Sequence, residues 1–186
     1  MNNEIKVLES QIRECFGRVI YSHKTHEKCA DIYLFRLAAI KNIQILLAAL
    51  TTGTVLSDIF SLFGLGIWAK VLSAVFSIAL LVLNAYSKNF NLGELAQKHR
   101  DTAIRLWKIR EDYLSLLTDI RASIADASII QVKRDALQAE LEVIYSSAPA
   151  TFNKAYKKAQ KALQISEDFT FNDGEIDKFL PDALRK

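Results

Sequence analysis

The sequence predicts an all-α membrane protein, in which a transmembrane helical hairpin is extended by long antiparallel helical arms and followed by two shorter C-terminal helices. Three observations carry this prediction. Residues 42–87 are almost wholly apolar and contain only two charged side chains, Asp58 and Lys70. The segments on either side repeat apolar residues at helical spacing. No segment shows the sustained polar and apolar alternation of a β-strand.

The apolar segment is long enough to cross a membrane twice. A hydrocarbon core of about 30 Å needs about 20 apolar residues in a helix, and two such lengths occur at 43–60 and 67–85. Gly64 and Gly66 supply the backbone freedom for a tight reversal between them. The alternative is a soluble protein with an unusually apolar buried hairpin. Because 24% of the 186 residues are charged, few apolar surfaces remain to cover two helices, and lipid insertion is preferred.

The positions of Lys and Arg predict how the hairpin is oriented. Basic residues precede the first span and follow the second, while the connecting turn has none. Cytoplasmic flanks of transmembrane helices are enriched in Lys and Arg, so both termini are expected in the cytoplasm. Lys70 lies one turn into the second span, from which its ammonium group can extend to the interface. The first 36 residues are too polar for a cleavable signal.

Two cytoplasmic helical arms are expected beside the hairpin, at 1–41 and 88–125. In both arms the seam residues recur at alternating steps of three and four, which is the spacing of a helix that packs along a partner helix. Each arm covers about 35 to 40 residues, or about 55 Å of helix, so the arms can pair antiparallel. The predicted seams are Ile5, Leu8, Ile12, Cys15, Val19, Ser22, His26, Cys29 and Tyr33, and Leu106, Ile109, Tyr113, Leu116, Ile120 and Ile124.

The C-terminal region, 126–186, is expected to hold two shorter amphipathic helices and a tail. Pro149 is expected in the first turn of the second of these helices. In the tail, Asn172-Asp173-Gly174 predicts a turn, and a short piece at 175–180 ends before Pro181. The two helices are placed at 129–145, with Val132, Ala136, Leu137, Leu141 and Ile144 on one side, and at about 150–163, with Phe152, Tyr156, Ala159 and Leu163.

The chain carries no arrangement typical of an enzyme or a cofactor site. It has no phosphate-binding glycine loop, nucleophile elbow or catalytic triad, so neither enzymatic activity nor a cofactor is predicted. His23, His26 and Cys29 lie near one helical face, but a zinc site needs a fourth ligand, and His99 is the only other histidine. Packing in the seam is therefore preferred over metal binding. A net charge of +3 is too small to indicate nucleic-acid binding, and anionic lipid accounts for the flanking cations.

Polar side chains within the spans are the candidate functional residues. Polar groups that face lipid are costly, so these should meet another helix or water. They either hold the helices together or line a water-filled path in an oligomer, and both interpretations stay open. Asp58, near the outer end, either joins a charged ring of several copies or is a solvated carboxylate beside the turn. The candidates are Gln44, Thr51, Asp58, Lys70, Ser73, Ser77 and Asn84.

Short segments distributed over nearly the whole chain carry a family resemblance. They are Lys-Thr-His-Glu-Lys-Cys-Ala at 24–30, the Trp-Lys-Ile-Arg-Glu-Asp-Tyr run within 105–114, Lys-Arg-Asp-Ala-Leu-Gln-Ala-Glu-Leu at 133–141, Ile-Tyr-Ser-Ser-Ala-Pro-Ala-Thr at 144–151 and Phe-Leu-Pro at 179–181. With two spans between the first and the second, this order resembles the SLATT family of two-span bacterial effectors. These segments reflect architecture rather than catalysis.

The resemblance implies that the chain is the toxic effector of a prokaryotic conflict system. Such proteins are encoded beside nucleotide second-messenger synthases, reverse transcriptases or sensor proteins, any of which could supply an activating partner. The implied activity is oligomerisation in the bacterial inner membrane, followed by pore formation or membrane disruption and abortive infection. The resemblance supplies no nucleotide-binding motif. The alternative is a non-conducting membrane scaffold whose cytoplasmic helices bind a partner protein.

Overall fold

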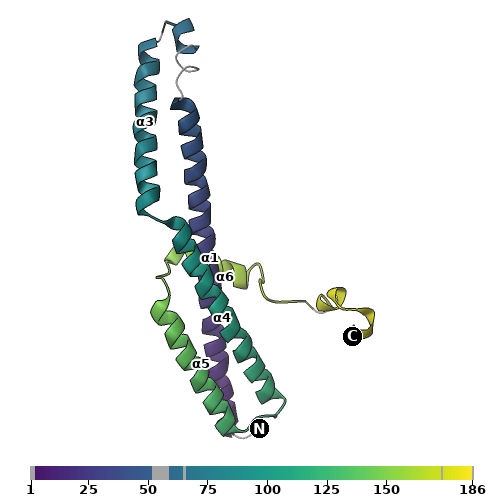
Figure 1. The fold of residues 1–186 in the computed structure, drawn as a ribbon. Coiled ribbons are helices and arrows are strands. Elements are labelled where there is room, and N and C mark those ends of the chain that lie inside the picture. Colours follow the sequence, from purple (N-terminus) through teal and green to yellow (C-terminus); the bar gives the residue numbers. More distant parts are fainter. Residues whose placement is uncertain (1–2, 52–58, 65, 173, 186) are drawn as a thin grey trace. The chain divides into compact units, whose positions relative to one another are not determined.

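A computed structural model describes residues 3–51, 59–64, 66–172 and 174–185, and these residues form helices, turns and loops without a strand (Figure 1). The predicted all-α class is confirmed. The elements are α1 (Asn3–Thr51), α3 (Gly66–Asn89), α4 (Leu92–Arg121), α5 (Ala127–Ser147) and α6 (Asn153–Gln164), followed by the 3-10 turns η1 (Ile176–Phe179) and η2 (Asp182–Leu184).

The helices belong to two compact units. The first unit combines residues 1–29 with 98–186, and the second consists of residues 30–97. Helices α1 and α4 each contribute to both units, whereas α3 lies wholly in the second, and α5 and α6 lie wholly in the first.

The core of the first unit is built by α1, α4 and α5. The two predicted seams meet there, because a helix with an apolar residue at every third or fourth position presents one continuous stripe to its neighbour. Helix α5 adds Ile130 and Ile144 to this core. From the seams, the core contains Leu8, Ile12, Cys15 and Val19 of α1, and Leu106, Ile109, Tyr113, Leu116 and Ile120 of α4.

The second arm differs from the prediction at both ends. Its helix was expected to continue from the membrane segment to about residue 125, but α3 ends at Asn89 and α4 begins at Leu92. The Asn91 side chain accepts a hydrogen bond from the Glu94 backbone N–H at 3.1 Å, which caps the new helix. At the other end α4 stops at Arg121 and Ser123 takes a positive φ of 56°. Ile124 is therefore 75% exposed, and its assignment to the seam was wrong.

The two C-terminal helices form, and their buried faces agree with the predicted ones in part. In α5, Ile144 lies in the core and Leu137 and Leu141 pack against it as predicted, whereas Val132 and Ala136 are exposed. The helix carries apolar residues on two faces, and periodicity alone does not select between them. Helix α6 begins at Asn153, four residues after Pro149, and it buries Ala155, Ala159 and Ala162 while Tyr156 is exposed. Ala159 belonged to the predicted face, whereas Ala155 and Ala162 were missed because the prediction favoured large apolar residues.

The tail contains the predicted turn. Gly174 adopts a positive φ of 74°, which is a conformation that glycine reaches without steric cost. The short piece that follows is η1, and it ends before Pro181 as expected. Asp173, the middle residue of the predicted turn, lies outside the described residues.

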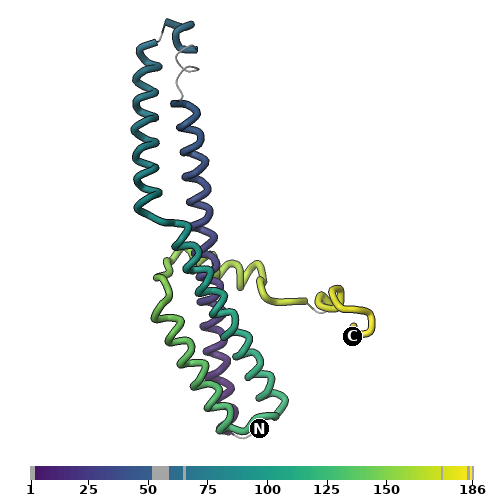
Figure 2. The backbone as a smooth tube through the Cα atoms, in the orientation of Figure 1, coloured from purple at the N-terminus to yellow at the C-terminus, as the bar shows by residue number. Residues whose placement is uncertain are grey.

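In the second unit, the C-terminal part of α1 runs beside α3 in an antiparallel hairpin (Figure 2). At the reversal Gly64 has a φ of 71°, and its N–H donates to the Ser61 carbonyl at 3.1 Å. Both helices are long and apolar enough to cross a membrane, and in each only 6% of the most apolar 18-residue window is buried. A soluble core helix would be covered by protein, and these are not. Residues 52–58 of the first predicted span lie outside the described residues.

We expect Ile109→Ala to destabilise the first unit by about 2–5 kcal/mol, because it removes a fully buried side chain and leaves a cavity at the seam. The matched control on the same helix is Ile104→Ala, whose side chain is 61% exposed, and its effect should stay within about 0.5 kcal/mol. Chemical unfolding of the full chain in detergent micelles, followed by circular dichroism, measures both. Equal effects of the two substitutions would contradict the seam.

Candidate functional site

The Gln44 side chain connects the two apolar helices through polar contacts. The Gln44 side-chain amide donates hydrogen bonds to Asn84 Oδ1 at 2.9 Å and to Ser87 Oγ at 3.2 Å. Gln44 lies on α1 and its two acceptors lie on α3. In lipid, where no water competes, such bonds hold neighbouring helices together. Gln44 and Asn84 are thus the two predicted site residues that the structure brings together.

The remaining candidates satisfy their polar groups locally or stay exposed. The Thr51 hydroxyl donates to the Ala48 carbonyl at 3.0 Å, and the Ser77 hydroxyl donates to the Ser73 carbonyl at 2.8 Å. These bonds within one helix allow a hydroxyl to face either lipid or water. Lys70 is exposed, whereas Ser73 is half-buried. Asp58 lies outside the described residues.

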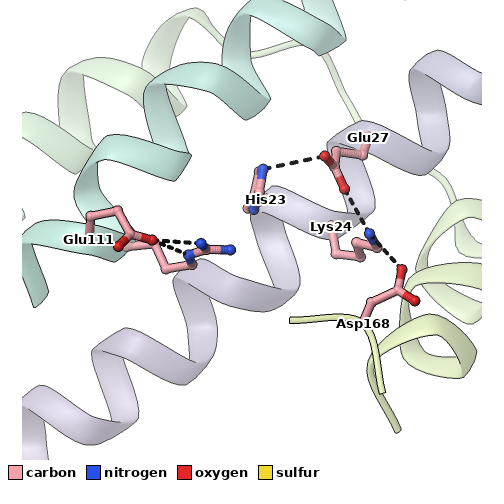
Figure 3. Close-up of polar contacts among 6 residues, drawn as sticks. His23, Lys24, Glu27, Glu111 and Asp168 are labelled. Atoms are coloured by element: carbon pink, nitrogen blue, oxygen red, sulfur yellow. Dashed lines mark hydrogen bonds and ion pairs between the residues drawn. The ribbon is translucent and has the colours of Figure 1, made fainter. Parts of the chain in front are cut away.

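The first unit holds a cluster of charged and aromatic side chains where the tail crosses α1 and α4 (Figure 3). Lys24 Nζ lies 2.8 Å from Asp168 Oδ2 and 3.0 Å from Glu27 Oε2, although Lys24 itself is buried. Burial opposes its positive charge. The hydrogen bonds to Asp168 and Glu27 outweigh that effect and raise the pKa of Lys24 above its ordinary value. The tail therefore supplies one of the two anions that keep this lysine charged.

Phe169, the next tail residue, packs against the same cluster. Lys24 Nζ lies 4.4 Å from the centre of its ring and the Arg110 guanidinium carbon lies 4.5 Å from it, which are cation–π distances. The His23 ring stacks on Phe169 at 5.5 Å with an angle of 11° between the planes. Phe169 has a φ of 74° and Glu167 a φ of 52°. Two left-handed residues this close together are sustained only by surrounding contacts.

Two buried histidines face each other beside this cluster. His26 Nδ1 and His99 Nδ1 are 2.9 Å apart, so one ring donates a hydrogen bond and the other accepts it. Burial, reinforced by the neighbouring His99, lowers the pKa of His26 to about 4. Burial also lowers the pKa of His99. Both rings are therefore neutral at physiological pH.

His99 was not predicted as a partner of His26, although the sequence holds the signal. Extending the seam of α4 backwards from Leu106 in the same steps reaches Ala103 and then His99. His26 occupies the matching place in the seam of α1. The motif with His23 and Cys29 does not close around a common centre, because His23 stacks on Phe169 and His26 faces His99. Within the described ranges, no three His, Cys, Asp or Glu side chains are placed to hold a metal ion.

A pocket of about 360 Å³ opens on the other side of the same turns of α1. Tyr21 and Tyr156 stack on each other at 5.9 Å, and the Tyr145 hydroxyl donates to Ser22 Oγ at 3.0 Å. The lining contains hydroxyl groups, aromatic rings and the His26 imidazole, but no Asp, Glu, Lys or Arg. Its residues are Tyr21, Ser22, Thr25, His26, Tyr145, Ala148, Pro149, Ala150, Thr151 and Tyr156.

Two uncovered apolar helices, beside a helical unit with its own core, are typical of a two-span helical membrane protein. A comparison with protein families agrees and is more specific. The family described as SMODS and SLOG-associating 2TM effector domain family 4 matches residues 8–175, and the chain belongs to this family. The SLATT resemblance is thereby confirmed. Comparisons with curated proteins and with solved structures each gave no significant match.

The histidine pair predicts how stability depends on pH. Because the pKa of His26 is lower in the folded chain than the ordinary value near 6.5, protons bind preferentially to the unfolded chain as the pH falls. The stability of the first unit should therefore be complete above about pH 6.5, and about 2 kcal/mol should be lost by about pH 5.

Thermal unfolding of the full chain in micelles at about pH 7.5 and pH 5 measures this loss. His26→Gln removes the titrating ring and keeps hydrogen-bonding capacity, so its loss should be smaller than that of the wild type. An unchanged unfolding midpoint in the wild-type chain would show that the pair does not stay neutral.

The tail contact gives a second prediction. Asp168→Asn removes the carboxylate that pairs with the buried Lys24, so we expect several-fold faster amide hydrogen exchange over residues 165–170. Asp182→Asn is the matched control, because Asp182 pairs with Arg185 at 2.6 Å on an exposed part of the same tail. Exposed pairs contribute little. Equal exchange in both variants would mean that Lys24 does not anchor the tail.

Proposed function

We propose that the chain is a membrane effector of a bacterial antiphage defence system. It resides in the inner membrane with both termini in the cytoplasm, oligomerises when triggered, and permeabilises the membrane so that the infected cell dies or stops growing. The observation that carries this proposal is the hairpin, whose apolar helix surfaces are not covered by the chain's own residues. Membership of a two-transmembrane effector family supports it.

The polar groups on the hairpin supply the physical basis for permeation. A pair of helices is too small to enclose water, so a path requires several copies whose polar faces turn towards one another. Lys70 and Ser77 are exposed on α3, and an exposed cation in a bilayer needs water or the interface. The Gln44–Asn84 bond joins the two helices of each copy, so we expect the hairpin to enter the assembly as a unit.

A trigger would act by changing the balance between separate and assembled copies. A ligand or partner shifts such an equilibrium only as far as its affinities for the two states differ. A partner from a nucleotide second-messenger, reverse-transcriptase or sensor system would provide that difference by binding the first unit. The proposal assigns no enzymatic step and no cofactor to the chain.

The alternative function is a non-conducting scaffold that recruits a partner protein to the membrane. The apolar side chains exposed on the first unit, such as Trp107 and Val132, favour it. In that case toxicity in cells would survive replacement of both spans by unrelated apolar helices. A permeabilising effector would lose its toxicity on the same replacement.

We expect Ser77→Leu to reduce dye leakage from liposomes that contain the full chain several-fold, because leucine removes a polar group from the proposed path. The Ser77 hydroxyl bonds only to its own helix, so insertion should be unchanged. The matched control is Ile78→Leu, which replaces a neighbouring exposed apolar residue and should leave leakage intact. Wild-type protein that is inserted and oligomeric but causes no leakage would contradict the proposed function.

A further inference from the structure

Helix α5 has a second apolar face that no other described residue covers. Its members recur at steps of three and four, which is the spacing of a helix that packs on another helix. They are exposed, Val132 at 70% and Val143 at 60%. Other residues of the same helix pack into the core, and among them Ile130 and Ile144 are fully buried. We call this face the outer seam, and it consists of Ile129, Val132, Ala136, Ala139 and Val143.

The first unit also carries an open groove of about 700 Å³ between α1 and α4. Phe16, Leu114 and Leu117 form an apolar floor, and Arg13 and Arg121 stand at its rim. Arg13 pairs with Glu9 at 3.0 Å, whereas Arg121 is exposed in the last turn of α4. We call it the α1/α4 groove, and its lining is Glu9, Arg13, Phe16, Leu114, Leu117, Thr118, Arg121 and Ala122.

The groove and α5 lie on opposite faces of the α1/α4 pair. On α1, Gln11 and Ser22 bond to α5. At 100° per residue, Phe16 and the other groove residues of α1 lie about 150° around the helix axis from Gln11 and Ser22. On α4, Lys108 bonds to α5, and the groove residues again come from the far side. Each copy therefore presents a helix ridge on one side and an apolar trough on the other.

We propose that the outer seam of one copy occupies the α1/α4 groove of a second copy. This contact rests on the proposed function, since it supplies the assembly that permeation requires. Charge supports the second copy as the occupant. Glu142 is exposed beside the outer seam and Arg121 is exposed in the lining of the groove, so the two surfaces carry opposite charges at these positions. Glu140 and Arg13 are already paired within one copy, with Lys108 and Glu9.

Pairing of two outer seams with each other is the competing arrangement, and charge disfavours it. In a parallel pair Asp135 of one copy would meet Glu140 of the other, because such flanking residues contact each other across the seam. The contact of seam with groove joins two different surfaces instead. Such contacts repeat from copy to copy and produce a ring, or an open row if the rotation does not close. A contact between identical surfaces stops at a dimer.

Paired cysteines test this contact in the full chain inserted in membranes. Val132→Cys places a thiol on the outer seam and Thr118→Cys places one in the groove, while the native Cys15 and Cys29 are buried. With both substitutions in one chain, oxidation should give a ladder of dimers, trimers and larger species. The wild-type chain and each single variant are the controls and should stay monomeric. A mixture of the two single variants should stop at dimers that contain one of each.

Two results would overturn the contact: no ladder from the double variant, or efficient dimers from Val132→Cys alone. Val132→Glu separates this failure from failure of the proposed function, because it places a charge on the outer seam far from the spans in sequence. Loss of both the oligomers and the leakage in this variant supports the contact. Leakage that persists at the wild-type level overturns it and leaves the proposed function standing. A cross-linked ladder from the double cysteine variant, in membranes that do not leak, supports the contact and overturns the proposed function.

Discussion

The pairing of α1 with α4 is the interaction on which the rest of the first unit depends. Its seam buries one residue per turn on each helix, from Leu8 to Val19 and from Leu106 to Ile120. Burial of this kind contributes about 1.5–3 kcal/mol for each large side chain and fixes the register of the two helices. That register brings His26 opposite His99 and Lys24 near Arg110. The apolar seam thus determines where the polar clusters form.

Sequence periodicity identified this seam because each arm carries a single dominant row of apolar residues. Each helix can therefore bury its apolar residues in only one orientation. Helix α5 shows where such reasoning stops. It has two apolar stripes, and Val132 and Ala136 satisfied the period as well as Ile130 did. Only the position of α5 over α1 and α4 selects the buried stripe. That position is set by packing of Ile130 and Ile144 against core residues of α1 and α4 that are far away in sequence.

The tail contact lay beyond sequence reasoning for a related reason. Asp168 and Phe169 lie in a segment without a repeat, and the chain there takes positive φ values at Glu167 and Phe169, which neither residue favours. Lys24, the partner of Asp168, lies 144 positions earlier in the chain, on helix α1. The spans were predictable because lipid imposes a length and a composition. Gln44 and Asn84 have a contact within one chain. A water-filled path lined by the predicted candidates Thr51, Asp58, Lys70, Ser73 and Ser77 stays a prediction, because it concerns several copies.

Lys24 links the tail to the stability of this cluster. An ammonium group taken out of water is tolerated only while anions compensate it, and here Asp168 and Glu27 do so together. Withdrawal of the tail would remove one anion and also uncover the face of His23 that Phe169 now covers. The lysine would then require a replacement anion or access to water. Displacement of the tail would therefore change the surroundings of the turn of α1 that carries Lys24.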